Sequence, residues 1–125
     1  MPFYLARLLP YVYMIDYSYM EKGMNTAADF QADILSAVAH PNRIRILEKI
    51  RYGINCNCEI APALGLEQSN LSRHLKILVK SGILRSWKDG LRTNYEIADK
   101  RIYKLLDIAA DIAKTKLEKQ TEVFA

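Results

Sequence analysis

Cysteine is scarce in this sequence: Cys56 and Cys58 are the two in 125 residues. Because so few cysteines cannot build a disulfide framework, we expect an apolar core to stabilise the fold. We also expect the protein to reside in a reducing compartment, the cytoplasm. Long apolar runs are missing too. The first 20 residues are rich in apolar side chains, but Arg7, Pro10 and Asp16 interrupt them within too short a run to span a membrane. No secretory signal with a cleavage site is recognisable. These absences favour a globular protein of the cytoplasm.

Two further absences argue against an enzyme. The sequence contains no glycine-rich phosphate loop and no recognisable pairing of a nucleophile with a base. The cysteine pair also lacks the C-x-x-C spacing, beside a βαβ unit, that dithiol redox enzymes use. We therefore expect no catalytic residues and no required cofactor.

Acidic residues do not balance the basic ones along the whole chain. The formal net charge is +4, and residues 67–101 carry eight Lys or Arg against four Asp or Glu, which accounts for the whole excess. A solvated charged surface is the simplest explanation of such a block. A positive field confined to one part of a small protein also fits a nucleic-acid partner.

Residues 64–82 predict a tight turn followed by a helix with two different faces. Gly65 suits the turn, because a side chain there would resist the backbone conformation required. A helix-turn-helix recognition helix has this layout, since its first residues touch base edges and its cations meet phosphates. An ordinary amphipathic surface helix is the alternative. At about 100° per residue, Leu71, Leu75, Leu78 and Val79 lie on one face, Ser69, Arg73, Lys76 and Lys80 on the other, and Asn70, Ser72 and His74 on the flanks.

Two helices are expected earlier in the chain. The first begins near Thr26, with Asn25 or Thr26 as its N-cap, and is broken at His40. Pro41 then takes the first position of a second helix, where proline is tolerated, and Gly53 ends that helix. The first helix has Phe30, Ile34, Leu35 and Val38 on one face, and the second directs Ile44, Ile46, Leu47 and Ile50 inward and Arg43, Arg45 and Lys49 outward.

A short helix is expected within residues 54–64, capped by Asn55 or Asn57. Pro62 lies beyond the free N–H positions of that helix, so it forfeits a hydrogen bond and keeps the helix short or kinked. After the recognition helix, which closes at a glycine C-cap, residues 83–97 predict a β-hairpin. The pair Asp89-Gly90 is a strong two-residue turn signal and would place Lys88 opposite Leu91 and Leu84 opposite Tyr95.

The last helix is expected over residues 100–120. It carries a long apolar stripe, which can cover the core of its own chain or pair with the same helix of a second chain. We therefore expect one domain over 25–120, with a C-terminal tail at 121–125. Residues 1–24 are expected to form a non-catalytic extension that is disordered or loosely packed. Alternatively the translation start is misplaced, since Met14, Met20 and Met24 offer later starts. A helix packing on a dimer partner and a weak surface anchor are the other interpretations of this extension.

Three linked motifs carry a family resemblance. A helix opens with His-Pro at 40–47, the run Gln68-Ser-Asn-Leu-Ser-Arg-His-Leu75 follows a turn, and Cys56-x-Cys58 precedes the helix-turn-helix. Together with the Asp-Gly hairpin they resemble the ArsR/SmtB family of winged helix-turn-helix repressors, over residues 28–120. The resemblance implies a mainly α fold of about five helices with a small β-hairpin wing. It also implies a homodimer, joined through its first and last helices, that binds a two-fold-related operator in double-stranded DNA and represses transcription.

The resemblance assigns roles to named residues. Gln and Asn can bond adenine and Arg can bond guanine, whereas lysines give affinity without sequence choice. For His74 a satisfied flank histidine is the competing interpretation. A winged-helix module that binds a protein, or DNA without sequence preference, is the alternative function. The expected DNA contacts are Gln68, Ser69, Asn70, Ser72, Arg73 and His74 at the bases, and Lys76, Lys80, Lys88 and Arg92 at phosphates.

The sequence also departs from the family. Glu67 stands where a Ser cap is common, so the first turn of the recognition helix is expected to be capped differently. Arsenite-sensing members usually add a third cysteine, but Ala61 stands at that position. Residues 100–120 contain no His or Cys, which excludes the family's metal site on the terminal helix.

Cys56 and Cys58 are candidate sensor residues because a helix N-terminus lowers the pKa of a thiol and raises its reactivity. Two thiolates can share a soft metal or metalloid ion such as arsenite, zinc or cadmium, or can respond to an oxidant. A disulfide between residues two apart is strained, so oxidation is expected to involve an outside thiol. Two small structural residues with no sensing role are the alternative. We hypothesise that an effector bound to the sulfurs distorts the short helix and releases the DNA.

Overall fold

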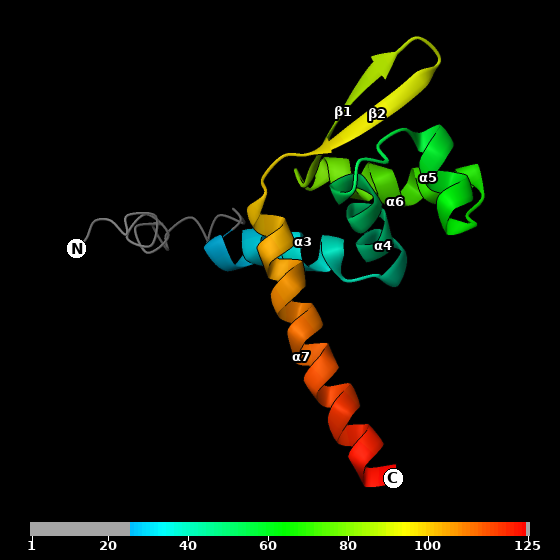
Figure 1. Cartoon of the computed structure of the whole chain (residues 1–125). Helices are drawn as coiled ribbons and strands as arrows, with labels where there is room; N and C mark the ends of the chain where they lie inside the picture. Colours follow the sequence, from blue (N-terminus) through cyan, green and yellow to red (C-terminus); the bar gives the residue numbers. More distant parts are fainter. Residues whose placement is uncertain (1–25, 125) are drawn as a thin grey trace. The chain divides into compact units, whose positions relative to one another are not determined.

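The computed structural model describes residues 26–124, and the chain divides into two units, residues 1–39 and 40–125. The predicted N-terminal extension, 1–24, lies outside the described residues. The described chain contains five helices and one two-stranded antiparallel sheet, which confirms a mainly α fold with a hairpin wing (Figure 1). The elements are α3 (Ala27–Val38), α4 (Pro41–Arg51), α5 (Asn57–Leu64), α6 (Gln68–Lys80), β1 (Leu84–Asp89), β2 (Arg92–Ile97) and α7 (Arg101–Phe124).

The N-cap of helix α3 is Thr26, one of the two residues expected, and it forms a capping box with Asp29. The hydroxyl of Thr26 accepts a hydrogen bond from the Asp29 backbone N–H, and the Asp29 carboxylate accepts one from the Thr26 backbone N–H. These reciprocal bonds satisfy two of the N–H groups that a helix start leaves open. Phe30 and Leu35 on this helix are more than half exposed.

Helix α4 starts at Pro41, also as predicted, and His40 caps it by accepting a hydrogen bond from the Asn42 backbone N–H. Ile46, Leu47 and Ile50 of this helix are buried. Ile44 was expected inside but is 39% exposed. At about 100° per residue it falls outside the sector that the other three share.

Helix α5 differs from the prediction at its first residue. Its N-cap is Cys56 rather than Asn55 or Asn57, and the sulfur accepts from the Cys58 backbone N–H. Pro62 lies inside the helix, which ends only two residues later at Leu64. Gly65 follows with φ of 65°, the left-handed conformation that the turn into α6 requires.

The hairpin is present, but its register is two residues away from the expected one. Leu84 pairs with Ile97 and Asp89 pairs with Arg92, so the turn is made by Gly90 and Leu91. Gly90 has φ of 64° whereas Leu91 has a negative φ, as in turns with glycine at the first central position. Because the shift is an even number of residues, each side chain keeps its predicted face.

A third extended segment pairs with the other edge of β2. The backbone N–H of Tyr95 donates to the carbonyl of Asn55 at 2.9 Å, and Cys56 forms an antiparallel bridge with Asn94. The segment that leads into α5 is therefore hydrogen-bonded to the second edge of β2. Strand β1 packs on α6 (Figure 1). These contacts attach the wing to both helices of the helix-turn-helix.

Helix α7 is longer than the helix expected over residues 100–120 and continues to Phe124. Its first turns belong to the core, where Leu106 is buried. The Arg51 guanidinium joins them to α4 through two hydrogen bonds of 2.7 and 2.9 Å to the Asp107 carboxylate. Farther along, the side chains of Ile108, Ile112 and Leu117 are about 60% exposed. Among the described helices, none is both long and apolar enough to cross a membrane.

Candidate nucleic-acid interface

Helix α6 has the two faces that the sequence predicts. Leu71, Leu75 and Leu78 are 0–2% exposed and hold the helix against the core. Asn70 is partly exposed and lies 3.5 Å from the Arg73 guanidinium. Apart from His74, the remaining predicted contacts of this helix are exposed, namely Gln68, Ser69, Ser72, Arg73, Lys76 and Lys80. The helix thus presents a row of hydrogen-bonding groups followed by two lysines.

The start of α6 has no side-chain cap, because Glu67 occupies the N-cap position without a capping hydrogen bond. We expected a different cap there, and the structure has none. Backbone N–H groups in the first turn of a helix point along its axis and favour an anion. The end of α6 that carries Gln68 and Ser69 can therefore also donate to a phosphate.

His74 is placed differently from the prediction. Its side chain is 8% exposed, and its ring lies 4.5 Å from the ring of His40, measured between centroids. The Arg43 guanidinium lies 3.2 Å from its Nδ1 atom. Burial, followed by the nearby His40, Arg43 and Arg73, lowers the pKa of His74 below its ordinary value. We therefore do not count His74 among the groups that can reach a base.

The wing places Lys88 and Arg92 on exposed positions beside the turn. Leu91, in the turn itself, is fully exposed. Arg85 is paired with Glu96 across the hairpin at 2.8 Å, so it is less available for a phosphate. The tip is therefore basic at two positions that no described carboxylate neutralises through an ion pair.

Two residues that the sequence did not single out join this surface. Ser86 and Tyr95, which are opposite one another in the hairpin, line a hollow of about 370 Å³ together with Lys76 and Lys80 of α6. Partial burial raises the pKa of the Tyr95 hydroxyl. The expected register had placed Tyr95 opposite Leu84, so the shared position of these hydroxyls was not visible in the sequence. Both can donate to an anion that the lysines attract.

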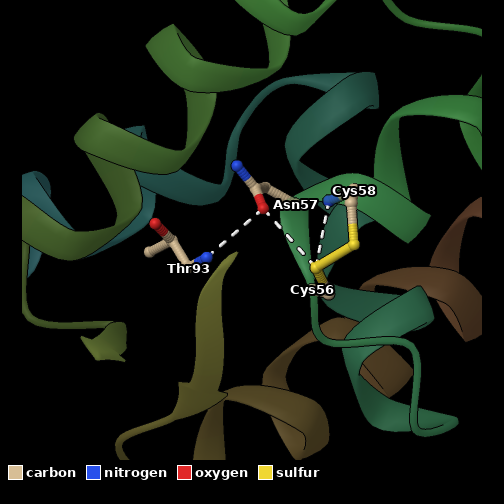
Figure 2. The surroundings of a disulfide bond; sticks show 4 residues. All are labelled: Cys56, Asn57, Cys58 and Thr93. Carbon is tan, nitrogen blue, oxygen red and sulfur yellow. Dashed lines mark hydrogen bonds between the residues drawn. A yellow bond between two sulfur atoms is a disulfide. The ribbon is translucent and has the colours of Figure 1, made fainter. Parts of the chain in front are cut away.

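The two cysteines are joined to one another in a disulfide, and among the described residues no cysteine is free (Figure 2). The expectation that oxidation needs an outside thiol is therefore wrong. Cys56 has an extended backbone and Cys58 is in the first helical turn. This change of conformation brings their Cα atoms to 5.2 Å, a usual separation for bridged cysteines.

Cys56 is buried whereas Cys58 is exposed, so one sulfur of the pair is accessible from outside. The Asn57 side chain between them contacts the wing, because its Oδ1 atom accepts from the Thr93 backbone N–H at 3.4 Å (Figure 2). The same oxygen lies 3.5 Å from the Cys56 sulfur, a contact in which a reduced thiol can donate and a disulfide cannot. The pair is thus linked to both α5 and β2.

Within the described residues, no group of three or more His, Cys, Asp or Glu is arranged to hold a metal ion. Cys56 and Cys58 would need a further ligand from outside this part of the chain to complete a metal site. Two thiolates are nevertheless a suitable partial donor set for a soft ion.

Known proteins resemble this chain in sequence and structure. The family model described as "Bacterial regulatory protein, arsR family" matches residues 40–86. An uncharacterized HTH-type transcriptional regulator of Methanocaldococcus jannaschii is 33% identical over 82 residues, which are 65% of this chain and 92% of that protein. A probable mercury resistance operon repressor of Streptomyces lividans is 31% identical over 88 residues, 70% of each chain.

A solved structure shares the fold. The homodimeric winged helix-turn-helix DNA-binding domain of a possible ArsR-family transcriptional regulator from Mycobacterium bovis superposes with a TM-score of 0.65 and 27% identity. The match covers 74% of this chain and 85% of that one. The elements that the structure places around α6 are therefore those of a winged helix-turn-helix.

Proposed function

Because the chain belongs to the ArsR family of helix-turn-helix transcriptional regulators, we propose that it acts in the cytoplasm as a homodimeric repressor bound to a two-fold-related DNA operator. The observation that carries the proposal is the division of α6 into a buried leucine face and an exposed polar and basic face. A surface helix of no special function does not need unpaired cations on its outer side and a basic wing beside it.

In this proposal the residues of α6 divide into two groups. Arg73 reads guanine and Gln68 reads adenine, because each side chain can form two hydrogen bonds with one base edge in the major groove. The lysines and the wing bind phosphates, which fixes the position of the protein without choosing a sequence. The proposed base contacts are Gln68, Ser69, Asn70, Ser72 and Arg73, and the proposed phosphate contacts are Lys76, Lys80, Lys88 and Arg92.

Dimer formation is supported by apolar side chains that a single copy leaves open. Ile108 and Ile112 are exposed along α7 and, four residues apart, are neighbours on one side of the helix, while Leu117 is exposed on another side farther along. Phe30 and Leu35 are similarly exposed on α3. We propose that both helices contribute to the contact with a second copy, as the homodimer of the related M. bovis domain suggests. Pairing of this kind would hold two copies of α6 at a fixed distance for two half-sites.

The test compares the affinity of the protein for DNA fragments from the region upstream of its gene with its affinity for random DNA of equal length, at two salt concentrations. We expect selective binding that Arg73→Ala weakens by about 1–3 kcal/mol at each half-site, and only at the preferred sequence. Affinity that is equal for all sequences and falls steeply with salt would instead indicate binding without sequence choice. No DNA binding at either salt concentration would favour a protein partner.

We further propose that Cys56 and Cys58 form the effector site and that oxidation is the switch. The two thiols would lose two protons and two electrons to an oxidant such as hydrogen peroxide, giving one disulfide and two molecules of water. Loss of the thiol proton removes the donor to Asn57, whose oxygen also accepts from Thr93 of the wing. Oxidation would thereby change how α5 and the wing are held beside α6.

The effector test measures operator release by hydrogen peroxide, arsenite, zinc and cadmium, for the reduced wild type and for the variant with Cys56→Ser and Cys58→Ser. Peroxide is expected to release the wild type, with recovery on adding a reductant, and to leave the variant bound. A soft ion that releases the wild type under reducing conditions would point to a metal or metalloid effector instead. If every agent acts equally on both proteins, the cysteines are not the sensor.

A further inference from the structure

The whole chain contains two histidines, and the fold brings them together. His40 caps α4 and His74 lies in the middle of α6, and their ring centroids are 4.5 Å apart. Histidine is the one side chain whose ordinary pKa lies between pH 5 and 8. Both imidazoles therefore lie at one junction, between α4 and the helix proposed to read DNA.

Hydrogen bonds hold both rings in the form that lacks a proton on Nδ1. At His40 the Nδ1 atom accepts from the Asn42 backbone N–H at 3.0 Å. At His74 the Nδ1 atom lies 3.2 Å from the Arg43 guanidinium, which has donors and no acceptor. Each Nδ1 must therefore offer its lone pair. A second proton on the His74 ring would displace the Arg43 donor that now occupies that position.

We propose that His40, Arg43 and His74 form a cluster that positions the recognition helix, and that protonation of His74 within this cluster weakens operator binding. The inference rests on the proposed function for its DNA readout. His74 is a positioning residue in this account, since its side chain faces α4 and acts on DNA through the neighbouring Ser72 and Arg73 of the same helix.

The surroundings of His74 oppose its charged form. The charged or titratable groups that act on it are His40 and Arg43 from the start of α4 and Arg73 from its own helix, and all three repel a second positive charge. Burial is the largest cause of its lowered pKa. Since the folded pKa is lowered, the neutral ring stabilises the fold fully above the ordinary pKa of 6.5. That contribution is lost as the pH falls from 6.5 toward the folded value.

Proton uptake is linked to DNA release if the bound state holds the neutral cluster more firmly than the free state does. Bound DNA would keep α6 in the described arrangement, with Arg43 donating to His74. The free domain can relax, hydrate the ring and accept the proton. Attraction between phosphates and a charged imidazole would act in the opposite direction, so the sign of the pH effect separates the two possibilities.

The test measures operator affinity at constant salt between about pH 7.5 and 5.5. One variant combines His40→Asn and His74→Asn, because asparagine keeps an acceptor near each Nδ1 and cannot take the proton. We expect the affinity of the wild type to fall severalfold over this range, because the full loss of about tenfold per cluster that one unit of pKa difference implies is reached only below both pKa values. The double variant should keep nearly constant affinity, and so should His74→Asn alone.

A second measurement does not involve DNA. The imidazole signals of the free wild type, followed by nuclear magnetic resonance, should give a pKa for His74 that is lower than the ordinary value. An ordinary or raised value would overturn the inference, as would an affinity that stays constant or rises on acidification, or a fall that persists in the double variant. Absence of operator binding at every pH would count against the proposed function, while the titration of His74 would still decide whether the cluster binds protons as inferred.

Discussion

Replacing Lys80 with alanine is expected to weaken operator binding without changing the preferred sequence. Lys80 lies in the last turn of α6, is exposed, and lines the hollow that it shares with Ser86 and Tyr95 of the hairpin. Within residues 26–124 it forms no ion pair, so its charge is available to a phosphate. Each phosphate contact contributes about 0.9 to the slope of log affinity against log salt.

The magnitude follows from the proposed two-fold symmetry. One substitution removes two phosphate contacts from a dimer, so the slope should become less steep by about 1.8. Over a fourfold rise in salt, the wild type should therefore lose about 12-fold more affinity than Lys80→Ala does. Fluorescence anisotropy with labelled operator, at four or more salt concentrations, measures both slopes.

Lys114→Ala is the matched control, since this lysine of α7 is also exposed, lies on the side of the helix away from Ile112, and the change of charge is the same. Its slope should stay close to that of the wild type. An unchanged slope for Lys80→Ala would refute the phosphate assignment. Equal losses for both lysines would show that overall charge, and not the position of Lys80 beside the wing, governs binding.

Three further outcomes test the fold and the dimer. Leu78→Ala should lower the free energy of unfolding by about 2–5 kcal/mol in urea denaturation, because it leaves a cavity under α6. Ile77→Ala, on the exposed side of the same helix, should lower it by less than about 1 kcal/mol. Similar losses for the two variants would contradict the orientation of the helix. Ile112→Glu should convert the dimer to monomers in sedimentation experiments while Thr121→Glu, on the opposite side of the helix, leaves it intact. A dimer that tolerates both would exclude the Ile112 face of α7. Hydrogen bonds from Arg101 hold the pKa of Asp99 at about 2, so its contribution is present above the ordinary value of 3.8 and lost as the pH falls toward 2. The decrease in the free energy of unfolding between about pH 5 and 2.5 should be smaller in Asp99→Asn than in the wild type. An equal decrease would show that the ion pair of Asp99 with Arg101 does not contribute to stability.

Interactions within one turn of chain made much of the fold predictable. The N-cap at Thr26, the helix start at Pro41 and the turn at Gly65 depend on the preferences of residues three or four positions apart. The spacing of the leucines in α6 similarly determined which face is buried, since an apolar stripe at helical spacing must pack on the core. The fold class and the exposed outer face of α6 follow from these local rules.

Other features depended on partners far away in the sequence. The hairpin register was wrong because the turn signal at Asp89-Gly90 allows more than one pairing, and β2 also pairs with the Asn55–Cys56 segment. The disulfide was missed because the spacing alone did not show that the chain changes from extended to helical between the cysteines.

The sequence by itself determined that this chain forms a winged helix-turn-helix with a basic outer face on α6, because helix caps, glycine turns and apolar spacing act locally. The tertiary structure decided which polar residues of that helix remain available. His74 lies at the edge of the leucine face, where helical geometry permits either burial or exposure. Its placement inside the protein was decided by His40 and Arg43, which α4 brings against it to satisfy the buried ring.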